Sequence, residues 1–382
     1  MYKKILIISI SDLKNDPRVN RQIHSLKDNF EVYTLGLKNP EINGVNFHQL
    51  VIKKAFFLRI FFALFTFFKR YALIEYFIVK YKVKFNRNEI YKIKFDLVIA
   101  NDIESLPIAF RIPGKNRIIL DAHEYSPEQF KDKFIWRMFY RGYNNFLCKK
   151  YLNKVYKMTT VCQAIAEEYS KIFNVTPEVI TNSIKYYELS PSPVKKDEIR
   201  ITHHGAAISS RKIELMIEMM NYTDERFTLD LMLLPTDNNY FKKLTNLAGK
   251  NVSIKAPVPM NKIVEATHGY DIGLFLLPPI GFNYKYALPN KFFEFIQARL
   301  AIAIGPSPEM SDYVKKYDLG IISDNFDPKS LANEINKLTK EKIEHYKNQS
   351  NKYAYELSME GNRSKFIELV AATLKNNNKN NL

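Results

Sequence analysis

The chain reads Leu288-Pro289-Asn290-Lys291-Phe292-Phe293-Glu294 at the stretch that decides its fold. This stretch follows an apolar run, 271–277, that is typical of a buried strand, and two prolines close that strand. From Pro289 the apolar residues recur at helical spacing, so a helix begins beside a strand end. Free backbone N–H groups at such a start, with the positive end of the helix dipole, suit a diphosphate. Glu294 would lie one turn deeper, where a carboxylate can accept hydrogen bonds from a ribose diol.

Strand and helix patterns alternate along the rest of the chain. The predicted strands cover 4–10, 31–35, 97–100, 118–120 and 200–204, and the predicted helices cover 18–28 and 362–374. Such alternation is typical of α/β proteins with parallel, doubly wound sheets. At 382 residues the chain exceeds one typical domain.

A segment rich in proline and charge, 190–198, interrupts this alternation. We therefore expect a first domain at 1–187, a linker at 188–199 and a second domain at 200–357, followed by a C-terminal helix and tail at 358–382.

The chain resembles the GT-B glycosyltransferases of the retaining type, whose two Rossmann-like domains face a central cleft and use nucleotide sugars. The resemblance covers nearly the whole length and rests on motifs that occur in the family's order. These motifs are 16–22, 121–124, 160–169 leading to 180–183, 204–211 and 288–294. The resemblance implies a GT-B α/β fold in which the final helix returns to the first domain. It also implies that a nucleotide diphosphate sugar is a co-substrate and that no other cofactor is needed.

A donor site is expected in the second domain. Its candidate residues are Gly205, Arg211, Lys212, Pro289, Asn290, Lys291 and Glu294, together with Val258, whose loop borders the nucleotide base in similar proteins. Glycine at 205 would allow a positive φ or a close approach of backbone to phosphate, although a plain turn glycine is the alternative. Arg211 could neutralise the leaving diphosphate by bidentate contact. Arg211, Glu294 and His123 are the candidate catalytic residues.

Two positions depart from the family pattern. Tyr286 stands where many members carry the first of two glutamates eight residues apart, and that glutamate contacts the transferred sugar. Ala206 stands where members commonly carry an arginine directly after the glycine. Stabilisation of the leaving group should therefore be weaker unless Lys212 or Lys291 supplies the second cation.

An acceptor site is expected in the first domain, at the strand ends that face the crevice of an open α/β sheet. Its candidates are Asp16, Arg18, Asp102, Glu104, His123 and Glu124. By resemblance, His123 would contact the acceptor or the transferred sugar. The alternatives are a structural histidine, an ordinary helix cap for Asp102 and a carboxylate partner for Arg18.

Positive charge is concentrated in two segments, 51–95 with a net charge of +9 and 131–157 with +7, out of +17 for the whole chain. The first segment is also densely aromatic, and its longest uncharged run, 60–68, is too short to span a membrane. If 59–80 formed one helix, a polar arc would contain Arg59, Thr66, Lys69, Arg70 and Lys80, with Glu75 as the exception. This composition favours peripheral contact with an anionic membrane surface. The alternative is that the phenylalanines are core residues. Nucleic-acid binding is disfavoured because no such module is visible.

Only Cys148 and Cys162 are present, with no metal-ligand or disulfide pattern, which favours a cytoplasmic location. The resemblance, together with the basic aromatic segment, implies a metal-independent glycosyltransferase of the hexosyltransferase type at the inner face of the plasma membrane. It would transfer sugar to a lipid-linked or surface-polysaccharide precursor, and the resemblance implies retention of anomeric configuration. A non-catalytic GT-B-like partner subunit and a nucleotide-sugar epimerase are the alternatives.

Overall fold

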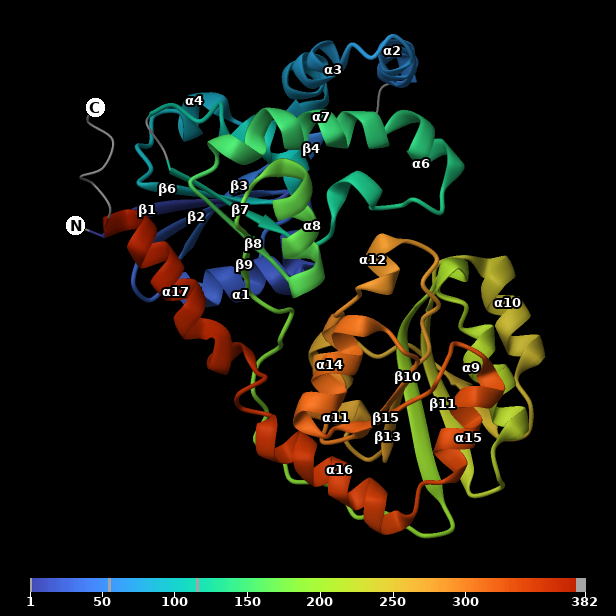
Figure 1. The fold of residues 1–382 in the computed structure, drawn as a ribbon. Coiled ribbons are helices and arrows are strands. Elements are labelled where there is room, and N and C mark those ends of the chain that lie inside the picture. The colour runs from blue at the N-terminus through green and yellow to red at the C-terminus, as the bar shows by residue number, and fades with distance from the viewer. Residues whose placement is uncertain (1, 54–55, 115–116, 376–382) are drawn as a thin grey trace. The chain divides into compact units, whose positions relative to one another are not determined.

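The computed structural model describes residues 2–53, 56–114 and 117–375, with side chains omitted for 56–60. It divides into two compact units, coloured along the chain in Figure 1. The first unit combines Met1–Thr181 with the chain from Arg363 on, and the second is Asn182–Asn362. The sequence placed the first boundary at 187 and the start of the last segment at 358.

The described part of the first unit is built on a parallel sheet of seven strands in the order β3-β2-β1-β6-β7-β8-β9. Their bounds are β1 Lys4–Ile8, β2 Glu31–Gly36, β3 Val45–Gln49, β6 Leu97–Asn101, β7 Arg117–Ala122, β8 Lys157–Thr160 and β9 Glu178–Val179. The central strands β1 and β6 are near-continuous apolar runs because helices cover both faces of a parallel sheet. The strand order reverses between β1 and β6, which is where such sheets bind ligands.

Helices from both ends of the chain cover this sheet (Figure 1). They are α1 Pro17–Leu26, α4 Arg87–Ile90, α5 Leu106–Ala109, α7 Arg141–Tyr151, α8 Gln163–Phe173 and α17 Met359–Lys375. The last helix, α17, buries Phe366, Leu369, Val370 and Leu374 in the same apolar core as Ile5 of β1. The final helix of the chain is thus part of the first unit.

The segment 59–80 is not one helix, so that part of the sequence analysis is wrong. It forms α2 (Phe56–Phe67) and α3 (Tyr71–Phe77), followed by a π-helical turn, Ile78–Lys82. The break lies at Lys69, whose φ is +52°, and the hairpin closes as Phe65 stacks on Phe77 with ring centres 5.7 Å apart. Thr66 is buried, and its hydroxyl donates to the carbonyl of Phe62 over 2.7 Å, so it belongs to no polar arc. The side chain of Arg59 lies outside the described residues.

Glu75, the acidic exception in that segment, anchors α3 to the sheet-covering helices. Its buried carboxylate accepts hydrogen bonds from Arg111 Nη2 (2.7 Å), Lys150 Nζ (2.5 Å) and the Tyr151 hydroxyl (2.8 Å). Burial alone would raise the pKa of Glu75, but Lys150 and Arg111 hold it below its usual value. Lys150 of the second charged segment and Arg111, which lies between the two segments in sequence, therefore hold α3 in place by ion pairs with a buried carboxylate.

The second unit has a parallel sheet of six strands within its residues, in the order β12-β11-β10-β13-β14-β15. The strands are β10 Ile199–Ala207, β11 Phe227–Pro235, β12 Val252–Lys255, β13 Ile272–Phe275, β14 Ala301–Ile304 and β15 Gly320–Ile322. The helices are α9 Glu214–Met219, α10 Asn238–Leu247, α11 Ile263–Thr267, α12 Phe282–Lys285, α13 Asn290–Gln297, α14 Pro308–Tyr317, α15 Pro328–Asn336 and α16 Lys340–Tyr353. The strand order reverses between β10 and β13. The predicted α/β class with two doubly wound sheets is confirmed.

Within the described ranges, no helix combines the length and apolar character that crossing a membrane requires.

Candidate functional site

In the second unit, Gly205 lies near the carboxyl end of β10 and has a φ of +124°. A Cβ atom at this position would lie 3.4 Å from Lys291 Nζ and 3.7 Å from Arg211 Nη1. Any side chain here would be strained by the positive φ, and its Cβ would stand in van der Waals contact with both cations. The glycine therefore leaves the backbone open beside two basic groups that are 80 residues apart in sequence.

Lys291 belongs to the first turn of α13 and is buried. Its Nζ lies 3.0 Å from His203 Nε2, and His203 Nδ1 lies 2.8 Å from the Leu274 carbonyl oxygen. Because that carbonyl can only accept, His203 donates from Nδ1 and its Nε2 accepts from Lys291. Lys291 Nζ also lies 4.4 Å from the centre of the Phe275 ring. Histidine and phenylalanine thus fix the position of the amine.

Arg211 completes the basic pair. It ends the short 3-10 helix Ser209–Arg211, and its Nη1 donates to the Ala206 carbonyl over 3.3 Å. Burial, followed by the charge of Arg211, holds the pKa of Lys291 well below its usual value. Within the described residues, neither cation forms an ion pair with a carboxylate. A bound anion would therefore offset an electrostatic cost that the charge of Glu294 compensates only in part.

Lys212, the other candidate for the second cation, is exposed and has a left-handed φ of +53°. It caps the short helix that ends at Arg211, while Lys291 lies beside Gly205. The structure thus brings together Gly205, Arg211 and Lys291.

Glu294 is buried one turn into α13, and its Oε2 lies 3.3 Å from His204 Nε2. Burial, and then the charge of Lys291, lowers the pKa of His204 well below its usual value, so this imidazole is neutral. Pro289 is the N-cap of α13 and provides no side-chain cap, which leaves the first backbone N–H groups of the helix without that partner. Asn290 Oδ1 is buried and has no hydrogen-bond partner among the described residues.

Two other predicted positions lie further out. Val258 is half-buried in the loop after β12, at the same edge of the sheet but two strands from β10. Tyr286 follows α12, and its ring packs on Phe282 with centres 4.8 Å apart. Next to it, the Tyr284 hydroxyl hydrogen-bonds Ser210 Oγ over 2.8 Å, which ties this segment to the loop that carries Arg211.

The first unit holds a second polar cluster at the carboxyl ends of β6 and β7. His123 Nε2 lies 3.0 Å from Asp121 Oδ2, and Nδ1 lies 3.4 Å from Asp102 Oδ1. The backbone N–H of His123 also donates to Asp102 Oδ1 over 3.1 Å. Asp102 has a φ of +59°, a conformation that costs a non-glycine residue roughly 1–3 kcal/mol and is typical of functional sites.

The two aspartates determine the charge of this histidine. Burial alone would lower the pKa of His123, but Asp121 and Asp102 raise it to about 9. His123 is therefore an imidazolium at neutral pH, and both ring nitrogens face carboxylates. This geometry suits a fixed positive charge rather than a general base.

The remaining acceptor candidates surround this group. Arg18 Nε lies 3.5 Å from Asp16 Oδ1, and its Nη2 lies 3.8 Å from Asp102 Oδ2, so Arg18 has carboxylate partners. Asp16 is the N-cap of α1 and accepts from two of its backbone N–H groups. Burial and then Asp102 raise the pKa of Glu104 to about 7, and the same two causes raise that of Glu124.

Several residues of these clusters were not among the sequence candidates. Gln22 of α1 donates to Asp121 Oδ2 over 2.6 Å and to Asn101 Oδ1 over 2.9 Å, so it orients the aspartate that holds His123. Gln22 lies in the quoted motif 16–22, and Asn101 directly follows the predicted strand 97–100, so their positions were the available signal. His203 and His204 are neighbours within β10, and their side chains reach different partners on α13. Among the described residues, no group of three or more His, Cys, Asp or Glu side chains could hold a metal ion.

Two doubly wound parallel sheets, with a last helix that packs on the first, define the GT-B fold. No protein-family model matches the chain, and no curated protein matches it by sequence. The likeness is visible in solved structures instead, and at such low identity it establishes the fold alone.

The similar structures include sucrose-phosphate synthase from Thermosynechococcus elongatus, with a TM-score of 0.69 and 13% identity over 97% of this chain and 98% of that one. WaaG, a glycosyltransferase involved in lipopolysaccharide biosynthesis, has a TM-score of 0.68 and 13% identity over 96% and 99%. HepE from Anabaena, in complex with UDP and glucose, has a TM-score of 0.68 and 12% identity over 97% and 100%.

TarM of S. aureus, in a complex that contains UDP, is also similar, with a TM-score of 0.57 and 15% identity over 73% of this chain. The chain spans only about half of TarM, 55% of its length.

Proposed function

We propose that this protein is a hexosyltransferase that moves a sugar from a nucleoside diphosphate donor to a lipid-linked or surface-polysaccharide precursor, with retention of anomeric configuration. It would act at the inner face of the plasma membrane. The observation that carries the proposal is the pair of cations, Arg211 and Lys291, beside Gly205 at the start of α13. A diphosphate is the anion that such a site fits best, because it offers oxygens to both cations and to the helix N–H groups.

The reaction follows from this arrangement. As the bond to the anomeric carbon breaks, negative charge grows on the leaving diphosphate, and fixed cations stabilise that charge without a metal. Similar proteins commonly carry an arginine at the position of Ala206. In this chain Lys291 would supply that second positive charge. Glu294, one turn deeper, would accept hydrogen bonds from the ribose. The sugar passes through an oxocarbenium-like state, and an acceptor hydroxyl then bonds to the anomeric carbon. By resemblance, the leaving phosphate takes the proton of that hydroxyl.

The polar cluster of the first unit would bind the acceptor or the transferred sugar. His123 is charged and lies between two aspartates, which stabilise its protonated form. It is therefore a poor proton donor, but it can hold the neighbouring carboxylates in place. Asp102, Glu104 and Glu124 are then the groups that could accept hydrogen bonds from acceptor hydroxyls. HepE and TarM were both solved with UDP, so uracil is the first base to test here.

The test is calorimetric titration of UDP, GDP, ADP, CMP and dTDP into the wild type and the variants Lys291→Met and Glu294→Ala. Lys291→Met should weaken binding of the preferred nucleotide roughly 10- to 100-fold, because a charged hydrogen bond is worth about 1.5–3 kcal/mol. It should also raise the melting temperature of the free protein, because the buried amine with its lowered pKa costs stability that methionine avoids.

Lys212→Met is the matched control, since that lysine is the exposed neighbour of Arg211. It should change neither property. Unchanged binding in Lys291→Met would contradict the proposed donor site. If no nucleotide binds the wild type, the non-catalytic partner subunit becomes the better interpretation.

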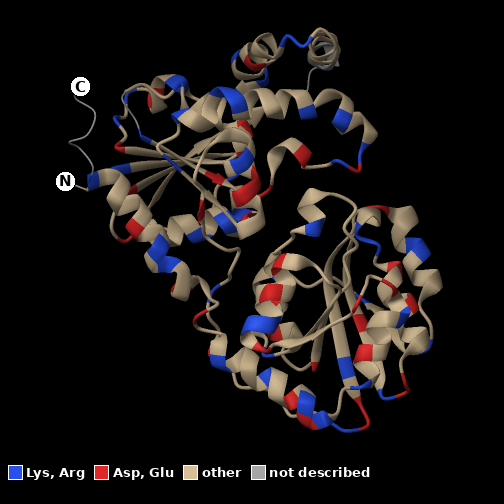
Figure 2. Ribbon diagram, in the orientation of Figure 1, with Lys and Arg blue, Asp and Glu red and all other residues tan. Residues whose placement is uncertain are grey.

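A surface of the first unit supports the membrane location. Phe67 and Phe68, at the end of α2, are 80% and 60% exposed, and Phe134 of α6 (Phe134–Phe139) is 65% exposed. Lysine and arginine recur in the link between α2 and α3 and along α6 and α7 (Figure 2). Exposed aromatic rings beside basic side chains fit the headgroup region of an anionic membrane.

A further inference from the structure

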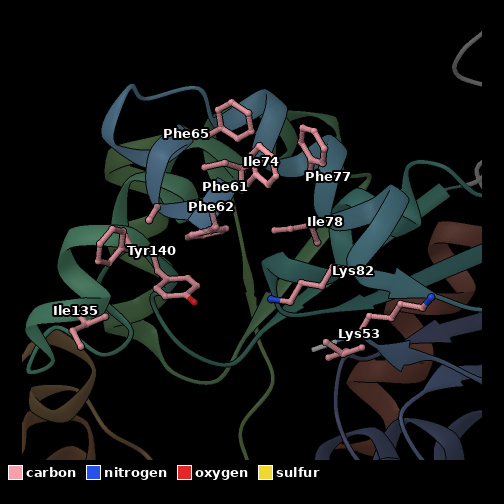
Figure 3. A pocket seen from close by; sticks show the side chains of 13 residues that line it. Lys53, Phe61, Phe62, Phe65, Ile74, Phe77, Ile78, Lys82, Ile135 and Tyr140 are labelled. Atoms are coloured by element: carbon pink, nitrogen blue, oxygen red, sulfur yellow. The ribbon is translucent and has the colours of Figure 1, made fainter. Parts of the chain in front are cut away.

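The first unit contains an apolar cavity of about 530 Å³ that lies apart from the polar cluster around His123. Its walls come from α2, α3, the π-helical turn after α3 and α6, and Figure 3 shows the side chains that line it. The volume lies within the range of pockets that bind small molecules, roughly 300–1,000 Å³. We call it the α2–α6 pocket.

Aromatic rings make the wall of this pocket rigid. Phe61, Phe65 and Phe77 stack on one another with ring centres 5.7 to 5.9 Å apart, and Phe62 packs on Tyr140 at 4.9 Å. These contacts hold α2 against α3 and against the end of α6 while leaving the space between them open. The pocket is therefore suited to hydrocarbon rather than to a sugar.

The polar groups of the pocket are basic. Lys82 extends into it, toward the side that carries Tyr140 (Figure 3). Lys53 lines the same region, and its backbone N–H donates to the Lys82 carbonyl over 2.8 Å, which fixes the two lysines as neighbours. None of the described lining residues is acidic. The acidic residue of α3, Glu75, is engaged by Arg111, Lys150 and Tyr151.

The pocket also borders the exposed apolar surface described above. Ile135, one of its lining residues, is 67% exposed, and Phe61 at the other wall is also exposed. Phe67 and Phe68 extend the same helix that carries Phe61 and Phe65. A ligand could thus enter from the headgroup layer of a membrane while its chain stays out of water.

We propose that the α2–α6 pocket binds the apolar chain of a lipid-linked acceptor, with Lys82 contacting the phosphate that joins this chain to the glycan. The proposal rests on the proposed function and narrows its acceptor to a lipid-linked one. An apolar chain matches the aromatic wall, and an anionic head matches Lys82, whose amine extends into the pocket (Figure 3), and the absence of acid among the described lining residues. A free sugar or a free oligosaccharide would satisfy neither group.

The test is titration of farnesyl phosphate and dodecyl phosphate into the full chain, with farnesol and inorganic phosphate as probes that lack the head or the chain. The two phosphorylated lipids should bind at least about tenfold more tightly than either incomplete probe. A preference between the branched and the linear chain would show which kind of lipid the pocket takes. Equal affinity for farnesol and farnesyl phosphate would overturn the role of Lys82.

Two variants test the location. Ala63→Trp places a large ring in the pocket and should weaken binding of farnesyl phosphate about tenfold or more, and Lys82→Ala should do the same. Their matched controls are Ala72→Trp, at an exposed position of α3, and Lys80→Ala, whose lysine lies over the rings of Tyr76 and Tyr81. Ala63→Leu replaces the tryptophan variant if its melting temperature falls.

Nucleotide titrations on the same proteins separate this proposal from the donor site. All four variants should bind the preferred nucleotide like the wild type. Unchanged binding of farnesyl phosphate in both Ala63→Trp and Lys82→Ala would overturn the pocket assignment. It would not affect the proposed donor site. Loss of nucleotide binding in Lys291→Met together with intact lipid binding would support both assignments.

Discussion

His123 is the residue at which charge and position are most tightly linked. An isolated buried histidine would be neutral, yet here two aspartates face its two ring nitrogens. The aspartates are themselves oriented by the backbone N–H of His123, by Gln22 and by Thr159, whose hydroxyl donates to Asp121 over 2.7 Å. The cluster therefore acts as a preformed set of charges and not as a proton relay.

This cluster predicts that the first unit becomes less stable in alkali. The folded pKa of His123, about 9, lies above its ordinary value of 6.5. The contribution of His123 to the free energy of unfolding is therefore complete below pH 6.5 and is lost as the pH rises through 9. This contribution is about 3 kcal/mol in all. Glu104, with a pKa raised from 4.5 to about 7, acts in the same direction but in a lower window. Urea unfolding at pH 6 and pH 9.5 measures the effect, followed by the fluorescence of Trp136, the single tryptophan.

His123→Gln should reduce this pH dependence, because the group that titrates is gone. His48→Gln, a histidine of the same unit outside the cluster, is the control and should retain the wild-type dependence. A variant at 123 that loses stability between pH 6 and pH 9.5 as the wild type does would rule out this assignment.

At the scale of elements, the hairpin of α2 and α3 is the feature that local sequence patterns described least well. The charges of 59–80 suggested one amphipathic helix, whereas the structure folds this segment back on itself at Lys69. Stacked phenylalanines within the segment hold the fold-back, together with the buried Glu75, whose partners lie in other segments. The result is an exposed aromatic end at Phe67 and Phe68 rather than a continuous apolar face.

This exposed end predicts how the protein binds membranes. The wild type should float with anionic liposomes at low salt and be released at high salt, because each basic residue near the surface contributes about 1 kcal/mol that salt screens. The double variant Phe67→Ser with Phe68→Ser should float poorly, since it loses the inserted rings. Leu247→Ser, an exposed apolar residue of the second unit, is the control. Failure of the wild type to float at low salt would disprove the membrane proposal.

At the scale of the whole molecule, each unit has its own apolar core, and the chain enters the first unit twice. The core of the first unit joins β1 and α1, near the start of the chain, to Phe366, Leu369, Val370 and Leu374 of α17. Arg363 also pairs with Asp28 over 3.2 Å. The second unit lies between these two segments in sequence and has a separate core.

Damage to α17 should therefore weaken the first unit selectively. Leu369→Ala removes a buried side chain and should destabilise that unit by about 2–5 kcal/mol, which Trp136 fluorescence in urea would report. Stabilisation of the second unit by the preferred nucleotide should be unchanged. Glu368→Ala, at an exposed position of the same helix, serves as the control. Equal loss in both units would contradict the assignment of α17 to the first core.

The sequence by itself determined the features that depend on neighbouring residues. The alternation of apolar runs with helical spacing predicted two doubly wound sheets, because hydrophobic periodicity is a local property. The start of α13 beside the end of a strand, and the presence of Gly205 and Arg211 near another strand end, were readable for the same reason.

Only the tertiary structure decided the features that depend on burial and on partners far away in the chain. It distinguished Lys291 from Lys212 because Lys291 approaches Gly205 across the sheet edge. It gave His123 its charge, since that charge depends on Asp102 as well as on the nearby Asp121. It also formed the α2–α6 pocket, whose walls come from segments more than 50 residues apart. The electrostatic free energy of a side chain is set by all the groups packed around it, and those groups are brought together only by folding.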